Sequence, residues 1–338
     1  MIKYVRTLSP FATADPELLG TKGAELVGLV QIGLPVPPAF VVTTEACGHF
    51  REHGSEPDGL ERELLRELAV LEEQVGRRFG DPANPLLVSV RSCEVSSLPG
   101  AMETVLDLGL NDDTVAGLAA TSGDEWFALD CYRRLLQMFG TAVAGVPADR
   151  YEPAPGPSAE IEALRSAIEG NKQVFLDHMG VPFPTDPLDQ LRMAITAAFG
   201  HGTGAVVQAM VFGNRGLYSG TGVAFSRDPE TGWPGDFGTY VPLGQGEDVR
   251  RSDRVAVPFA ELHQLDLASY RRLRSFMNTL ERHHRDMCRI EFTVEDGRLW
   301  VLEAGIGERS AAAAARIAAD LVQEGWITRD EASLRIGA

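Results

Sequence analysis

Apolar residues recur along the chain at helical spacing in several long stretches. Between about residues 58 and 80 they predict a charged amphipathic helix that packs one face against a core; the apolar positions are Leu64, Leu65, Leu68, Leu71 and Val75. The same spacing predicts further helices over residues 125–143, 159–179, 267–287 and 311–324. A proline-rich stretch, residues 153–158, is typical of a linker.

Short runs of aliphatic and β-branched residues predict strands between these helices. Residues 86–90 form one such run, which ends at Arg91. Residues 206–212 and 220–225 form two more, separated by the turn sequence Gly-Asn-Arg-Gly at 213–216. Two strands joined in this way predict a β-hairpin.

A second hairpin is predicted from residues 289–294 and 298–303, joined through Glu295, Asp296 and Gly297. A three-residue loop places Glu291 and Glu303 on one face of the hairpin together with Val301. The other face then carries an apolar stripe of Ile290, Phe292, Val294, Trp300 and Leu302. A two-residue loop would separate the two glutamates, so the three-residue loop is favoured. Two carboxylates on one face suit a magnesium site completed by phosphate oxygens, and the alternative is a solvated sheet face.

Two cations lie where a polyphosphate could bind. Arg91 ends a buried strand and precedes a loop of small residues and glycine, at 96–101, whose backbone N–H groups suit phosphate oxygens. Lys22 lies between Gly20 and Gly23 at the start of a predicted helix, where the helix end also attracts anions. The alternative at both places is an ordinary solvated cation.

Composition limits the remaining possibilities. The 338 residues carry a formal net charge of −17, which disfavours unspecific binding to nucleic acid or to an anionic membrane. The four cysteines show neither metal-ligand spacing nor the density of a disulfide scaffold. Residues 1–10 contain no apolar signal region and no stretch approaches transmembrane length, so a cytoplasmic protein is expected.

The stretch VRSCEVSSLPGAMETVLDLGLND, residues 90–112, resembles the signature loop of the nucleotide-binding domain of the pyruvate phosphate dikinase family, and more loosely that of phosphoenolpyruvate synthase. Residues 18–47, 207–232 and 285–305 resemble the same family in the same order. The resemblance implies an α+β fold of the ATP-grasp type with a helical insert. The subdomains expected are residues 1–112 with 185–227, then the insert 113–184, and then 228–338.

The resemblance also implies ATP and Mg²⁺ as cofactors and a role for particular residues. Lys22 and Arg91 would contact the phosphates and serve catalysis. A loop would cover the phosphates with Gly100, Ala101, Met102, Glu103 and Thr104. The adenine side would be bordered by Gln208, Met210 and Val211, and the pocket lined by Gln245 and Glu247. Glu291 and Glu303 would bind the metal, although the family has a glutamine where Glu303 stands.

The phosphate clamp departs from the family pattern. Gly305 stands where the family has an arginine that contacts the transferring phosphate region, and Glu308 stands where it has a lysine. Arg309 is retained and is predicted to substitute as a catalytic cation. Cations at such places carry much of phosphoryl-transfer catalysis, so their loss predicts a much slower reaction.

The favoured hypothesis is an ATP-dependent phosphotransferase, a kinase of the pyruvate phosphate dikinase type. In the family the chain continues into a phosphohistidine domain and a pyruvate-binding barrel, which these 338 residues do not contain. The expected acceptor is therefore a histidine of a separate phosphohistidine-domain protein, or a small molecule. The alternative is a non-catalytic nucleotide-binding or regulatory subunit, and a pure interaction subunit without nucleotide is the least favoured.

Overall fold

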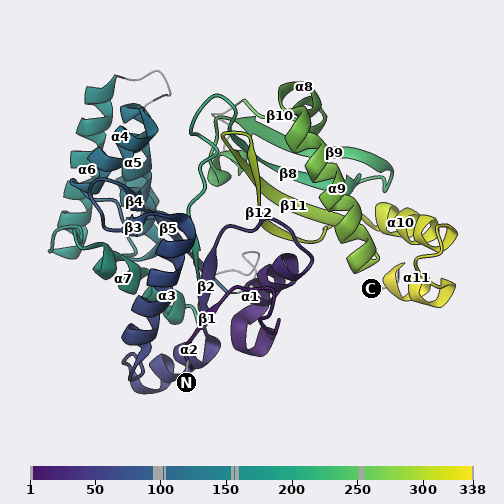
Figure 1. Ribbon diagram of the computed structural model, residues 1–338, viewed down its shortest axis with the longest axis horizontal. Helices are drawn as coiled ribbons and strands as arrows, with labels where there is room; N and C mark the ends of the chain where they lie inside the picture. Colours follow the sequence, from purple (N-terminus) through teal and green to yellow (C-terminus); the bar gives the residue numbers. More distant parts are fainter. Residues whose placement is uncertain are drawn as a thin grey trace. The chain divides into compact units, whose positions relative to one another are not determined.

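The computed structural model describes residues 3–93, 102, 104–153, 156, 160–250 and 255–336. The chain folds into two compact units. The first comprises Met1–Gln31 and Pro37–Met210, and the second comprises Ile32–Val36 and Val211–Ala338. Each unit has its own five-stranded sheet (Figure 1).

The sheet of the first unit is antiparallel throughout, in the order β1-β2-β7-β5-β6. Its strands are β1 (Val5–Thr7), β2 (Ala39–Val42), β5 (Val88–Ser92), β6 (Val105–Leu108) and β7 (Ala205–Ala209). The central strands β2 and β7 are buried along their whole length. Continuous apolar runs of this kind are typical of strands with both faces covered.

Helices pack against this sheet. Helices α1 and α3 contact β2, and α7 contacts β5 and β7. The helices of the unit are α1 (Pro16–Gln31), α2 (Thr44–His53), α3 (Leu60–Val75), α4 (Thr114–Ser122), α5 (Glu125–Ala142), α6 (Ile161–Met179) and α7 (Pro187–Gly200), with a short 3₁₀ helix η1 (Ala148–Arg150). A small parallel pair, β3 (Arg78–Phe79) and β4 (Pro85–Leu86), completes it.

The helical content expected for residues 113–184 is present as α4, α5 and α6, which lie within the first unit. Helix α5 packs against α4, α6 and β6. Asp130 is buried in α5 and forms ion pairs with Arg133 at 2.6 Å and with Arg134 at 2.8 Å. Each of these buried charges therefore has an opposite charge as its partner.

The sheet of the second unit is also antiparallel, in the order β10-β9-β8-β11-β12. Its strands are β8 (Gly220–Arg227), β9 (Pro234–Pro242), β10 (Val257–Pro258), β11 (Cys288–Glu295) and β12 (Arg298–Ile306). Helix α9 contacts β8, β11 and β12. The helices are α8 (Leu262–Leu265), α9 (Leu267–His284), α10 (Ala311–Gln323) and α11 (Arg329–Ile336), with 3₁₀ helices η2 (Gly246–Arg250) and η3 (Phe259–Glu261).

The structure corrects the first predicted hairpin. Strand β7 pairs with β2 and β5, whereas β8 pairs with β9 and β11, so residues 206–212 and 220–225 belong to different sheets. The first unit ends at Met210, and residues 211–227, expected in the first subdomain, belong to the second unit. Two strand-like runs around a glycine turn look alike in sequence whether the chain turns back or enters another sheet.

Candidate functional site

Lys22 lies just after a break in helix α1. Gly20 has φ 68° and ψ 171°, which interrupts the helix, and the N–H of Lys22 donates a hydrogen bond to the carbonyl oxygen of Cys93 at 2.9 Å. A Cβ on Gly20 would lie 2.4 Å from the Cβ of Cys93, so this approach needs glycine. The helix segment that carries Lys22 is thereby fixed against the residue that follows β5.

Arg91 lies on β5, two residues before Cys93, opposite Val206 of β7. Its Nε is buried and has no hydrogen-bond partner among the described residues. The structure therefore brings the predicted pair Lys22 and Arg91 to the same end of β5, with Lys22 linked to that end through its backbone. A buried guanidinium nitrogen with an unused N–H is suited to an anion.

The predicted phosphate-covering loop lies mostly outside the described residues, which include neither Gly100, Ala101 nor Glu103. Met102 is buried and Thr104 is half-buried directly before β6. Val90 on β5 lies opposite Val105 on β6, so the strands on the two sides of this stretch are neighbours in the sheet.

The residues predicted at the adenine side have structural partners. Gln208 is buried in β7, and its Nε2 donates a hydrogen bond to the carbonyl oxygen of Pro37 at 3.2 Å. Met210 is half-buried, and its N–H donates to the carbonyl oxygen of Leu87 at 2.9 Å. Val211 belongs to the second unit. Contact of these three residues with a base stays a prediction.

Gln245 is buried in the second unit. Its Oε1 accepts a hydrogen bond from the N–H of Gly213 at 3.1 Å, and its own N–H donates to the carboxylate of Asp248 at 2.9 Å. Its Nε2 is buried and has no hydrogen-bond partner in the described part of the chain. Glu247 lies in η2, and its side chain is outside the described residues.

The acidic hairpin has a shorter loop than predicted. Glu295 lies opposite Arg298, so the loop is Asp296 and Gly297 alone, with φ angles of 47° and 74°. Two residues with positive φ are the signature of a tight type I′ hairpin turn. The three-residue loop is therefore wrong.

The two glutamates nevertheless face each other, because β12 contains a bulge. Phe292 lies opposite Val301 but Glu291 lies opposite Glu303, which leaves Leu302 as an extra residue. A bulge of this kind reverses the alternation of side chains along the strand. The predicted apolar stripe changes accordingly: Trp300 and Leu302 are half-buried, and the buried positions of β12 are Leu299, Val301 and Ala304.

Sequence reasoning missed Arg289, which contacts both predicted metal ligands. Its guanidinium forms an ion pair with Glu291, and its Nη1 lies 3.5 Å from Glu303 Oε1. Arg289 lies directly opposite Gly305 on β12. The signal was available, since residues two apart on a strand share a face and Arg289 precedes Glu291 by two.

Arg309, the predicted substitute cation, is paired with a buried carboxylate. Its guanidinium makes an ion pair with Asp286, including a contact from Nη2 to Oδ2 at 2.8 Å. Arg335 of α11 also reaches Asp286 Oδ2, at 3.2 Å. A phosphate would therefore have to compete with Asp286 for this guanidinium.

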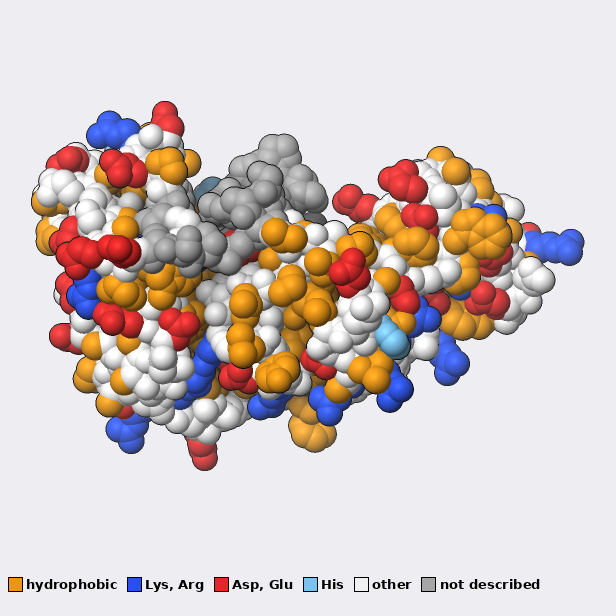
Figure 2. All heavy atoms as spheres, turned by 90° about the horizontal axis from the view of Figure 1, so that it is seen from above, with side chains coloured by type: hydrophobic (Ala, Val, Ile, Leu, Met, Phe, Trp, Pro, Cys, Tyr) orange, Lys and Arg blue, Asp and Glu red, His pale blue; other side chains and the backbone are white. Residues whose placement is uncertain are grey.

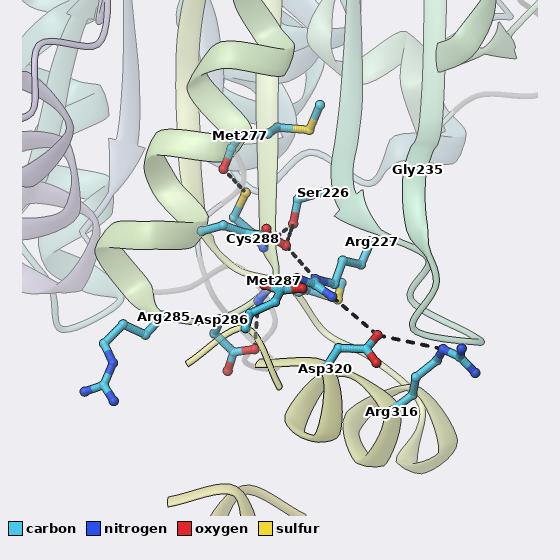
Figure 3. A network of polar contacts seen from close by, with 12 residues as sticks. Ser226, Arg227, Gly235, Met277, Arg285, Asp286, Met287, Cys288, Arg316 and Asp320 are labelled. Carbon is cyan, nitrogen blue, oxygen red and sulfur yellow. Dashed lines mark hydrogen bonds and ion pairs between the residues drawn. The ribbon is translucent and has the colours of Figure 1, made fainter. Parts of the chain in front are cut away.

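A buried arginine network fixes the start of β11 (Figure 3). Arg227 pairs with Glu281 of α9 at 2.8 Å and with Asp320 of α10 at 3.5 Å. Burial disfavours the charge on Arg227, but Glu281 and then Glu324 outweigh it and raise the pKa of its guanidinium. Ser226 donates to Glu281 and accepts the N–H of Cys288, the residue directly before Arg289. The hydrogen bond from Cys288 to Ser226 thus fixes the first residue of β11, the strand that carries Arg289 and Glu291.

The described residues contain neither a cluster of three or more metal-binding side chains nor a membrane-spanning helix. Within the described ranges, no group of three or more His, Cys, Asp or Glu side chains is arranged to bind a metal ion. None of the described helices combines the length and the apolar character needed to cross a membrane. Acidic, basic and apolar side chains are interspersed over the face drawn in Figure 2.

Comparison with known proteins shows the family. A family model described as "Pyruvate phosphate dikinase, AMP/ATP-binding domain" matches residues 55–257. The chain is 42% identical over 341 residues to the chloroplastic pyruvate, phosphate dikinase of Mesembryanthemum crystallinum, covering 92% of this chain and 36% of the relative. It is 39% identical over 370 residues to the pyruvate, phosphate dikinase of Clostridium symbiosum, covering 100% of this chain and 42% of the relative.

A third relative, the pyruvate, phosphate dikinase of Giardia intestinalis, is 39% identical over 357 residues, covering 95% of this chain and 40% of the relative. The chain therefore spans less than half the length of these relatives. The matched region is an ATP-grasp type domain, as the resemblance implies, and the two-sheet α+β structure agrees with it. The chain belongs to the pyruvate phosphate dikinase family, and residues 55–257 match the family's AMP/ATP-binding domain.

Proposed function

We propose that this chain binds MgATP and passes a phosphoryl group to an acceptor outside residues 1–338. The observation that carries the proposal is the junction at Cys93. There the backbone of Lys22 is bonded to the end of the strand that presents Arg91, in a chain of the AMP/ATP-binding family. Two cations at a glycine-containing helix start and strand end suit a polyphosphate.

Lys22 and Arg91 have different tasks in this proposal. Arg91 offers a planar guanidinium that can bind two phosphate oxygens at once. Its Nε is buried and has no hydrogen-bond partner among the described residues. Lys22 supplies a single positive charge next to the helix start. Both offset the phosphate charge against a chain of net charge −17.

Glu291 and Glu303 would hold the magnesium ion. They lie directly opposite each other, and carboxylate oxygens are ligands that Mg²⁺ prefers, so the pair fits the ion. Bound there, Mg²⁺ would neutralise charge on the phosphates, which is its usual contribution to phosphoryl transfer. The protein's own part is to orient the two carboxylates.

The acceptor is proposed to be a histidine of a phosphohistidine domain, or a small molecule. None of the seven histidines of the sequence lies in a glycine-rich Thr-Ser-His setting. A chain that only binds nucleotide is the second candidate. Two observations favour it: Gly305 offers no side chain, and Arg309 is held by Asp286.

Calorimetric titration with MgATP, followed by a turnover assay with candidate acceptors, tests both candidates. Saturable binding and transfer of labelled phosphate to an acceptor would support the phosphotransferase. Binding without turnover under any acceptor would support the second candidate. An absence of binding, and of any shift in unfolding temperature at millimolar MgATP, would contradict both, because a ligand of the native state must stabilise it.

A further inference from the structure

Arg289 places a positive charge against both proposed metal ligands. It is ion-paired with Glu291, and its Nη1 lies 3.5 Å from Glu303 Oε1. All three side chains are about one-quarter exposed, so solvent and solutes reach them. Two glutamates directly opposite each other on neighbouring strands repel, and the guanidinium offsets that repulsion.

A divalent cation on the same carboxylates would compete with this guanidinium. The cation carries twice the charge of Arg289, and it repels the guanidinium once it is bound. Arg289 has room to move away, because its cross-strand neighbour is Gly305 and no described atom lies within 4 Å of the position that a Cβ there would take. A guanidinium released beside a bound nucleotide has phosphate oxygens as its natural partners.

We propose that Arg289 is a phosphate-binding cation of the second unit and that, without nucleotide, it is the internal counter-ion of Glu291 and Glu303. The phosphate-binding half of this proposal rests on the proposed function. The counter-ion half rests only on contacts within the hairpin. Together they make nucleotide and divalent cation bind cooperatively, since each favours the state in which Arg289 has left the glutamates.

The test compares wild type with Arg289→Gln, Arg289→Lys and a matched control, Arg298→Gln. Arg298 lies on the same hairpin, exposed, with its guanidinium 4.0 Å from the Trp300 ring. Mn²⁺ alone is titrated first by calorimetry and electron paramagnetic resonance. Coupling between two binding events typically changes an affinity by about 5- to 150-fold. Arg289→Gln, which lacks the competing guanidinium, should therefore bind Mn²⁺ roughly tenfold more tightly than wild type. Arg298→Gln should match wild type, and an unchanged Mn²⁺ affinity in Arg289→Gln would overturn the counter-ion role.

MgATP is titrated second. Arg289→Gln should bind it roughly tenfold more weakly, the opposite direction to Mn²⁺, and Arg289→Lys should be intermediate because it keeps the charge but not the fork. Gly305→Arg, added to Arg289→Gln, should restore affinity from the directly opposite position. If wild type binds MgATP and Arg289→Gln binds it with the same affinity, the phosphate-binding role of Arg289 is overturned, while the counter-ion role is not. A wild type that binds no MgATP would instead contradict the proposed function, and the phosphate role with it.

Discussion

Gly20 and Cys93 approach so closely that only glycine can occupy position 20. A Cβ there would lie 2.4 Å from the Cβ and 3.0 Å from the carbonyl oxygen of Cys93, and the φ of Gly20 is +68°. The contact joins two stretches far apart in sequence, and it sets the place of Lys22 beside the end of β5.

Gly20→Ala should therefore destabilise the first unit by about 2–4 kcal/mol and weaken MgATP binding, because it combines a steric clash with an unfavourable backbone conformation. Gly28→Ala is the matched control. It lies on the same helix with nothing within 4 Å of the new Cβ, and should be neutral or stabilising by up to about 1 kcal/mol. Denaturant unfolding measures both, and equal effects would refute the fixed approach at Gly20.

Arg91→Ala should weaken MgATP binding more than Lys22→Ala. The guanidinium can hold two phosphate oxygens, whereas the ammonium is a single mobile charge. Arg78→Ala, an exposed arginine of the same unit, controls for the loss of one positive charge. Calorimetric titration decides, and equal losses for Arg91 and Lys22 would count against the bidentate contact.

Asp130→Asn should destabilise the first unit by about 3–5 kcal/mol, because it removes the buried negative charge with which both Arg133 and Arg134 form ion pairs. Glu125→Gln, which removes an exposed pair with Arg165, should cost no more than about 1 kcal/mol. Fluorescence of Trp126, the only tryptophan of the first unit, reports unfolding there once the other three are replaced by phenylalanine.

The same carboxylate predicts a pH dependence. Burial alone would raise the pKa of Asp130, but Arg134 and Arg133 outweigh it, so the pKa lies below the ordinary 3.8. A lowered pKa contributes stability that is fully present above 3.8 and is lost as the pH falls through the folded-state value. The unfolding free energy of the wild type should therefore fall more steeply below pH 3.8 than that of Asp130→Asn. Parallel curves would contradict the assignment.

Arg309→Ala should lower the stability of the second unit and leave MgATP affinity almost unchanged. The reason is that Arg309 is held by Asp286, which Arg335 also contacts. Asp286→Ala should have a similar effect on stability. The opposite pattern, an intact fold with lost turnover, would show that Arg309 leaves Asp286 and acts as the catalytic cation predicted from sequence.

The hairpin of β11 and β12 shows how far periodicity carries a prediction. The two strands and the placing of both glutamates on one face were predicted correctly, but through a loop that is one residue too long and a register in which Glu291 does not lie opposite Glu303. In the structure a two-residue turn would place Glu303 on the buried face, and the extra residue Leu302 reverses this. The alternation of apolar and polar residues along a strand can be seen in the sequence, whereas a bulge depends on how the neighbouring strands pack. The sequence pattern therefore could not distinguish a three-residue loop from a two-residue turn combined with a bulge at Leu302.

Other features of the fold and of the site depend on contacts between residues far apart in sequence, which local sequence patterns do not predict. The apolar run 206–212 indicated a strand, but not that β7 pairs with β2 and β5. Gly20 and Lys22 were singled out as a helix start, and the structure adds the hydrogen bond to Cys93. Arg309 was predicted as a catalytic cation and Arg289 was not singled out, because only the tertiary structure pairs the first with Asp286 and the second with the glutamates.

The short segment Ile32–Val36 belongs to the second unit, although the residues on both sides of it belong to the first. Pro35 in this segment accepts a hydrogen bond from the N–H of Val301 on β12. During synthesis on the ribosome, Pro35 emerges early and must wait for nearly the whole chain before its partner strand exists. A gene fragment that stops at residue 210 would therefore leave this segment without its native neighbours, and dissecting the protein into independently expressed halves requires more than a single cut.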